Sequence, residues 1–132
     1  MIEFTKKDIL RGTLVEPAWY RMKIEGLEKK ISAKGDSTNY NYECSIIKNA
    51  DNGDTKFQEV PLTINFNSKA IGFMKDFFTS LGGEVVPGSR FDEAAAVGKE
   101  IEAYIINEEY EGRQVNKCKH QYRAAKEASP VA

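Results

Sequence analysis

The chain has 132 residues, of which 41% are hydrophobic and 30% are charged, a length and balance typical of one globular domain. Its formal net charge of -1 argues against indiscriminate electrostatic binding of nucleic acid, which depends on clustered lysine and arginine. No apolar run approaches the roughly 20 residues of a membrane span, and the first eight residues lack the apolar stretch of a signal peptide. We therefore expect a cytoplasmic protein without membrane contact.

Residue types that usually carry catalysis or hold metals are scarce. The single histidine, His120, offers little scope for general base catalysis, and no Cys-x-x-Cys motif accompanies it. We expect Cys44 and Cys118 to be free thiols, because nothing indicates export. Gly82 and Gly83 end a predicted helix instead of opening one, so they do not form a phosphate-binding loop. We expect neither an enzyme nor a bound metal or cofactor.

Three strands are predicted in the first half of the chain. Hydrophobic side chains alternate over residues 19–25 and again over residues 40–46. The turn-forming run at residues 49–54 separates these from a third strand, in which Pro61 predicts an edge or a bulge because it has no backbone N–H. The predicted inward side chains of the first and third strands are Tyr20, Met22, Ile24, Val60, Leu62, Ile64 and Phe66.

The second half contains one helix and a hairpin. From the N-cap Ser68, hydrophobic residues recur at spacings of three and four as far as Gly82, which predicts an amphipathic helix of about 13 residues. A short helical turn at residues 91–97 follows, ended by Gly98. Two strands, reversed at Glu111 and Gly112, then complete the chain. The predicted inward side chains are Ile71, Met74, Phe78 and Leu81 in the helix and Ile101, Ala103 and Ile105 in the fourth strand.

The predicted order of elements is strand, strand, strand, helix, strand, strand. This is the order of a five-stranded OB-type barrel, a mainly β fold with one helix after the third strand. A small α+β sheet covered by one helix has the same order, so the order alone leaves both architectures open. We expect one domain over residues 1–132, with flexible ends at about residues 1–10 and 124–132.

Trp19, Arg21 and Lys23 share the outward face of the first predicted strand. Single-stranded nucleic acid is bound by aromatic rings that stack on bases and by cations that contact phosphates, and this face supplies both. Stacking contributes about 1–3 kcal/mol per base, so a few such residues suffice without a large net charge. The alternative is that Trp19 fills one end of the barrel and that the two cations are solvated.

Tyr40 and Tyr42 lie two residues apart on one face of the second predicted strand. At that spacing the two rings match successive bases of a nucleic acid strand. The alternative is that both point inward with Cys44 and Ile46 and belong to the core.

The last predicted strand has the densest positive charge of the chain. Its residues Lys117, Lys119 and Arg123 are predicted to share one face and to contact phosphates. The alternative is cross-strand pairing with glutamates of the preceding strand, such as Glu100 and Glu102.

Turn and strand signatures recur along the chain: VEPAWY at 15–20, KGDSTNY at 34–40, FNSKA at 66–70, VGKE at 97–100 and EYEGRQVNK at 109–117. Together they resemble a family of small bacteriophage proteins, long catalogued as a domain of unknown function, that look like OB-fold single-stranded DNA-binding proteins. The resemblance spans roughly residues 15–123 and is more specific for fold than for activity.

The resemblance implies sequence-tolerant binding of single-stranded DNA in a phage replication or recombination module, in the host cell cytoplasm, with phage replication or recombination proteins as partners. DNA is expected on the outer strand face, helped by the loop at residues 34–39 and by the hairpin loop at Tyr110. A protein-interaction or assembly module on the same fold, with self-association as one form, is the alternative. The expected DNA-binding residues are Trp19, Arg21, Lys23, Lys34, Tyr40, Tyr110, Lys117, Lys119 and Arg123.

Overall fold

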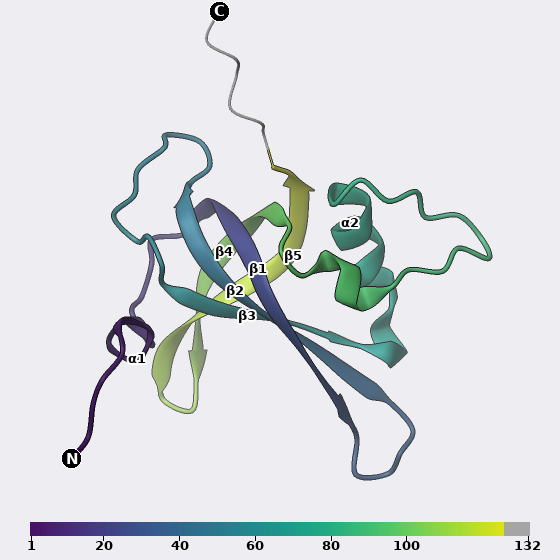
Figure 1. Ribbon diagram of the computed structural model, residues 1–132, viewed down its shortest axis with the longest axis horizontal. Coiled ribbons are helices and arrows are strands. Elements are labelled where there is room, and N and C mark those ends of the chain that lie inside the picture. Colours follow the sequence, from purple (N-terminus) through teal and green to yellow (C-terminus); the bar gives the residue numbers. More distant parts are fainter. Residues whose placement is uncertain (126–132) are drawn as a thin grey trace, which may run out of the picture.

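A computed structural model describes residues 1–125 of the protein (Figure 1). Its centre is a five-stranded antiparallel sheet in the order β3-β2-β1-β4-β5. The main helix α2 follows β3 in the chain, and the fold is mainly β with one main helix, as the sequence predicts. The elements are α1 (Lys6–Leu10), β1 (Ala18–Ile31), β2 (Thr38–Asn49), β3 (Pro61–Asn67), a 3-10 helix (Ser68–Ala70), α2 (Gly72–Ser80), a second 3-10 helix (Glu93–Ala96), β4 (Glu100–Tyr110) and β5 (Arg113–Ala124).

The sheet is open, whereas we expected a closed barrel. Strands β3 and β5 are its two edges and share no backbone ladder within the described residues. Aromatic rings lie between them: the centroid of Phe66 on β3 is 6.1 Å from that of Tyr122 on β5. Phe77 of α2 packs against both rings, with centroid distances of 5.0 and 5.3 Å. Side-chain packing under α2, and not backbone pairing, therefore joins the two edges.

The predicted inward faces of the strands are confirmed. Tyr42 is buried as well, and its hydroxyl donates a hydrogen bond to the backbone oxygen of Glu93 at 2.9 Å, so this tyrosine belongs to the core. Pro61 begins the edge strand β3, as its missing N–H predicts. The buried side chains of the strands and their flanks include Tyr20, Met22, Ile24, Val60, Leu62, Ile64, Phe66, Ile101, Ala103 and Ile105.

The helical region differs from the prediction in detail. The first turn is a separate 3-10 helix, and its cap is Asn67 instead of Ser68, because the Asn67 side chain accepts a hydrogen bond from a backbone N–H two residues on. Ile71 lies between the two helices and is exposed, so the predicted apolar stripe is shifted along the helix. The buried side chains of α2 are Met74 and Phe77.

Two asparagines anchor the segment that leads into β1. Asn116 on β5 accepts a hydrogen bond from the Val15 N–H at 3.0 Å and donates one to the Thr13 carbonyl at 2.7 Å. Asn107 on β4 donates to the Val15 carbonyl at 2.9 Å. Val15 itself is buried. The chain therefore enters the sheet across the end formed by β4 and β5.

Of the two ends that we expected to be flexible, the structure describes the first fully and the second only in part. Residues 1–10 contain α1, whose first turn has a capping box between Thr5 and Asp8. The expected flexible end at residues 124–132 lies, from residue 126 onward, outside the described residues. Within residues 1–125, no helix combines the length and the apolar character needed to cross a membrane.

Candidate nucleic-acid interface

The ring of Trp19 on β1 is already in contact with a cation. Trp19 is half-buried and lies opposite Tyr104 on β4, edge to face, with centroids 5.7 Å apart. The guanidinium carbon of Arg123 on β5 is 4.3 Å from the centroid of the indole ring. Such a cation–π contact covers one face of the ring. At most the other face of Trp19 is therefore left to stack on a base.

Arg123 is held by two carboxylates. Its Nη2 donates to Asp51 at 2.6 Å, and its Nε donates to Glu102. Glu102 is only 1% exposed, although its position on β4 falls on the outward face. The hydrogen bond to Asp51, followed by that to Glu102, raises the pKa of Arg123 above its ordinary value. A phosphate would have to compete with both carboxylates for this half-buried arginine, so we assign Arg123 the role of positioning Trp19.

Two other predicted cations are paired with β4. Arg21 donates from Nε to Glu100 at 2.5 Å, and the ammonium of Lys117 lies 3.0 Å from Glu108. Cross-strand pairing, which the sequence left open as the alternative, is therefore what Lys117 and Arg123 adopt. Lys23 and Lys119 are exposed and form no ion pair within residues 1–125.

The remaining predicted residues lie at two hairpins. Lys34 is exposed in the loop between β1 and β2, and Tyr110 at the end of β4 is 59% exposed. Tyr40 on β2 is half-buried, with the Lys29 ammonium 5.9 Å from its ring centroid. In Figure 1 both hairpins point to the lower side of the molecule, and β3 runs between them. The nine predicted residues therefore divide between this side and the outer face of β1, β4 and β5.

A groove of about 440 Å³ opens between β3 and β5, next to the β4–β5 hairpin. Its lining within the described residues contains two arginines and no carboxylate. Arg11 and Arg113 are exposed and form no ion pair with any residue of the described part of the chain. The groove is lined by β3 and β5, which are about fifty residues apart in the sequence. No local sequence signal therefore identifies it. Its lining includes Arg11, Pro61, Thr63, Arg113, Gln114 and Asn116.

The outward face of β2 and β3 between the two hairpins is a ladder of polar side chains. Amides and a hydroxyl bridge the two strands by hydrogen bonds, which leaves further donor and acceptor capacity toward solvent. This face offers hydrogen-bonding groups but no aromatic ring. The cross-strand pairs are Asn39 with Asn67, Asn41 with Asn65 and Glu43 with Thr63.

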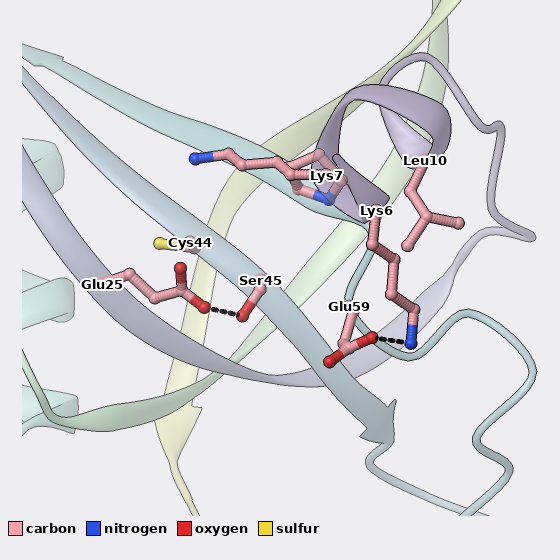
Figure 2. A pocket seen from close by; sticks show the side chains of 8 residues that line it. Lys6, Lys7, Leu10, Glu25, Cys44, Ser45 and Glu59 are labelled. Carbon is pink, nitrogen blue, oxygen red and sulfur yellow. Dashed lines mark hydrogen bonds and ion pairs between the residues drawn. The ribbon is translucent and has the colours of Figure 1, made fainter. Parts of the chain in front are cut away.

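A smaller cavity of about 180 Å³ lies beneath α1 (Figure 2). Lys6 pairs with Glu59, the Ser45 hydroxyl donates to Glu25, and Lys7 reaches across the cavity from α1. Two lysines and two glutamates line this cavity, so their charges cancel. It therefore has no electrostatic preference for an anionic strand, unlike the groove between β3 and β5.

Within the described residues, no three His, Cys, Asp or Glu side chains are grouped so that they could hold a metal ion. No protein-family model matches the chain, and no curated protein sequence matches it. The assignment of an interface therefore depends on the geometry and charge of the residues described above.

Proposed function

We propose that this protein binds single-stranded DNA in a sequence-tolerant way, along a track on β3 that begins in the groove between Arg11 and Arg113. The observation that carries the proposal is the charge of this groove, whose described lining has two unpaired arginines and no carboxylate. Phosphates can replace counterions on such cations directly, because no protein carboxylate has to be displaced. The phage replication or recombination setting is part of the proposal through the sequence resemblance alone.

We further propose that the sheet is an OB-type barrel left open between β3 and β5. The strand order and the position of α2 after β3 support this assignment. OB folds bind nucleic acid on the face of strands two and three, between the loops that join strands one to two and four to five. The corresponding surface here is the polar ladder of β2 and β3, between the hairpins of Lys34 and Tyr110.

The residues predicted from the sequence then take separate roles. Tyr110 stacks on a base at one hairpin, and Lys34 contacts phosphate at the other. The tip of the β4–β5 hairpin also carries Glu109 and Glu111, whose negative charges repel phosphates. In this proposal the phosphates therefore pass on the side of Arg113. Trp19, with Arg123 over its ring, is structural in this proposal. Lys23 and Lys119 lie away from the track.

The test is the salt dependence of binding to a fluorescently labelled oligo-dT, followed by anisotropy. Each phosphate contact contributes about -0.7 to the slope of log affinity against log salt for single strands. Arg11→Ala and Arg113→Ala are each expected to weaken binding and to flatten the slope by about 0.7.

Lys117→Ala is the matched control, because Lys117 is already paired with Glu108. We expect this variant to keep the affinity and slope of the unaltered protein. If the unaltered protein gives no anisotropy change at low salt, or if Arg113→Ala behaves like the control, the proposal is wrong.

Assembly through protein contacts is a second candidate function, favoured by exposed apolar side chains near the start of the chain. Ile2, Phe4 and Ile9 are 81%, 69% and 70% exposed. Where such side chains form a contiguous patch, the patch marks a contact site for other chains. Sedimentation velocity of the unaltered protein and of a Phe4→Ser, Ile9→Ser variant tests this. Assembly that the variant abolishes supports it, and a monomer at every concentration, with or without DNA, refutes it.

A further inference from the structure

A second cavity lies at the other end of β3, between α2, Tyr40 of β2 and the loop at residues 83–92. Its volume is about 360 Å³, within the range of about 300–1,000 Å³ that is usual for ligand sites. Most of its lining is apolar or aromatic, which is the other common property of such sites. The lining side chains include Tyr40, Ile71, Met74, Phe78, Val86 and Phe91.

Flat rings from two parts of the chain line this cavity. Phe78 of α2 and Phe91 of the loop stack nearly parallel, with centroids 4.9 Å apart and an interplanar angle of 9°. Tyr40 adds a third ring from β2, and it has no ring contact with any aromatic side chain of residues 1–125. Because Phe78 and Phe91 cover one face of each other, at most the outer faces of this pair and the ring of Tyr40 are left to a flat, unsaturated group.

The charged groups at the cavity favour an anion. Lys75 of α2 lines the cavity and forms no ion pair within the described part of the chain. Glu93 also lines it, but its carboxylate is bound by Lys29, and this hydrogen bond lowers the pKa of Glu93. The carboxylate is therefore already neutralised by a protein cation, whereas the ammonium of Lys75 is available to a ligand. An aromatic wall beside an unpaired cation matches a base and its phosphate.

The cavity also lies where the proposed DNA track leads. Strand β3 has seven residues, which span about 23 Å at about 3.3 Å per residue. Its first residue lines the groove of Arg11 and Arg113, and Ser68, directly after its last residue, lines the cavity. A strand of DNA that follows β3 therefore arrives at the aromatic cavity after several nucleotides.

We propose that this cavity takes one unstacked base of the bound DNA, with the adjoining phosphate on Lys75. The inference rests on the proposed single-stranded DNA binding and adds a defined base site to it. Single-stranded nucleic acids are commonly held in this way, with a base turned out onto aromatic side chains. The aromatic lining accepts any base, so the site keeps the binding sequence-tolerant.

Gly72 provides a substitution that adds a side chain at the wall of the cavity. It lines the cavity at the first residue of α2, and a Cβ atom built there meets no other atom within 4 Å. Gly72→Leu is therefore expected to occupy the space without disturbing the fold. Thr79→Leu is the matched control, because Thr79 is exposed on the same helix and lies outside the cavity lining.

We expect Gly72→Leu to weaken binding of a short oligo-dT by about 5- to 160-fold, the range that stacking of one base corresponds to. Thr79→Leu should bind like the unaltered protein. In a series of oligonucleotides with one abasic position each, the unaltered protein should lose a similar factor at one position. Gly72→Leu should be insensitive to that same abasic position, because the base site is already filled.

The outcomes separate this inference from the proposed function. If Arg113→Ala weakens binding while Gly72→Leu and the abasic series do not, the base site is refuted and DNA binding stands. If the unaltered protein does not bind oligo-dT, both fail. Should circular dichroism show that Gly72→Leu is unfolded, Val86→Glu replaces it. Val86 is an exposed loop residue of the same lining, and a negative charge there should repel the phosphate to a similar degree.

Discussion

Arg123 joins Trp19, Asp51 and Glu102, which come from three different parts of the sheet and its loops. Removal of its guanidinium takes a charged partner from the buried Glu102 and uncovers the indole ring. We expect Arg123→Ala to lower the free energy of unfolding by about 2–4 kcal/mol, because Glu102 stays buried with one cationic partner fewer and the indole loses its cation–π contact. Urea denaturation followed by the emission of Trp19, the only tryptophan, measures this loss.

The control for this substitution is Lys117→Ala, which removes an ion pair between exposed side chains. Pairs of that kind contribute less than about 1 kcal/mol. A loss at Arg123 no larger than the loss at Lys117 would show that the network around Trp19 does not stabilise the fold.

His120 is expected to make stability depend on pH. Its Nδ1 lies 2.8 Å from the Tyr122 hydroxyl, and its ring stacks on Phe73 at 4.7 Å. Burial, with a smaller contribution from the charge of Lys117, lowers the pKa of His120 below its ordinary value. The unfolded chain therefore binds the proton more readily, and stability is full above about pH 6.5 and falls as the pH drops below it.

Thermal denaturation between pH 7.5 and pH 5 measures this effect, with His120→Asn as the comparison. Asparagine tolerates the positive φ of 56° at this position and does not titrate. The variant should lose less stability than the unaltered protein across the interval. Carboxylates with a lowered pKa, such as Asp36 and Glu93, lower the stability only when they are protonated, below about pH 5. They therefore do not account for a loss of stability between pH 7.5 and pH 5. Parallel curves for the two proteins would rule out His120 as the cause.

At the residue scale, alternation along the strands predicted which side chains point outward, but it left open whether the cations of the last strand pair with glutamates of the fourth. Trp19 and Arg21 are on the expected face of β1. The pairing of Arg123 with Glu102 depends on the register between β4 and β5, which shifts between Ala103 and Ile105. A register shift of this kind arises from the packing of the whole sheet, and local sequence patterns do not contain it.

The hairpin between β4 and β5 turns through two residues with positive φ, Glu111 at 50° and Gly112 at 79°. Glutamate is a poor residue for this conformation, whereas asparagine adopts it readily and is preferred in two-residue turns of this type. We expect Glu111→Asn to raise the free energy of unfolding by about 0.5 kcal/mol.

Glu111→Ala separates this effect from loss of the glutamate charge, because alanine has neither the charge nor the preference for positive φ. Denaturation of both variants should rank asparagine above alanine. Equal stabilities would mean that the backbone conformation of the turn does not limit the stability of the protein.

Helix α2 contacts the open side of the sheet mainly through Phe77, which packs against Phe66 and Tyr122. Truncation of a fully buried phenylalanine lowers the free energy of unfolding by about 3–5 kcal/mol, and we expect this for Phe77→Ala. Phe73 is half exposed on the same helix and touches His120, so Phe73→Ala should lose much less. Similar losses at both positions would contradict the orientation of the helix.

At the element scale, periodicity predicted the existence of this helix but not its phase. The sequence reads as one helix from Ser68 to Leu81, with Ile71 on the apolar face. The structure instead changes from a 3-10 turn to an α-helix at Ile71, with Phe77 in the core and Ile71 exposed. The side-chain cap lies at Asn67, and a cap one residue earlier than expected is difficult to distinguish in a single sequence.

At the scale of the whole molecule, the order and number of strands could be predicted, but closure of the sheet could not. Closure depends on what lies between β3 and β5, and here the rings of Phe66, Phe77 and Tyr122 occupy that space. For the same reason, the interface proposed from the structure differs from the one predicted from the sequence. The groove of Arg11 and Arg113 exists only because two edges that are distant in the sequence approach without pairing.

Hydrogen exchange can decide between the two surfaces that the sequence and the structure favour. On addition of oligo-dT, we expect exchange to slow in β3 and in residues 113–116, where DNA would cover the groove. The backbone around Trp19 on β1 should be unaffected, because its outward face is not on the proposed track. Protection confined to the strands around Trp19 would move the interface back to the outer face of β1, β4 and β5.

The two thiols of the protein are placed so that they report on the open side of the sheet. Cys44 is buried on β2, within the sheet, and Cys118 is buried on the edge strand β5. Burial raises the pKa of both thiols and suppresses the reactive thiolate. Separation of the edge strand β5 would expose Cys118 to alkylation or oxidation, and separation of the other edge strand, β3, would expose Cys44, which is in register with Leu62 of β3. The ratio of the two labelling rates would then show which edge of the open side separates more often.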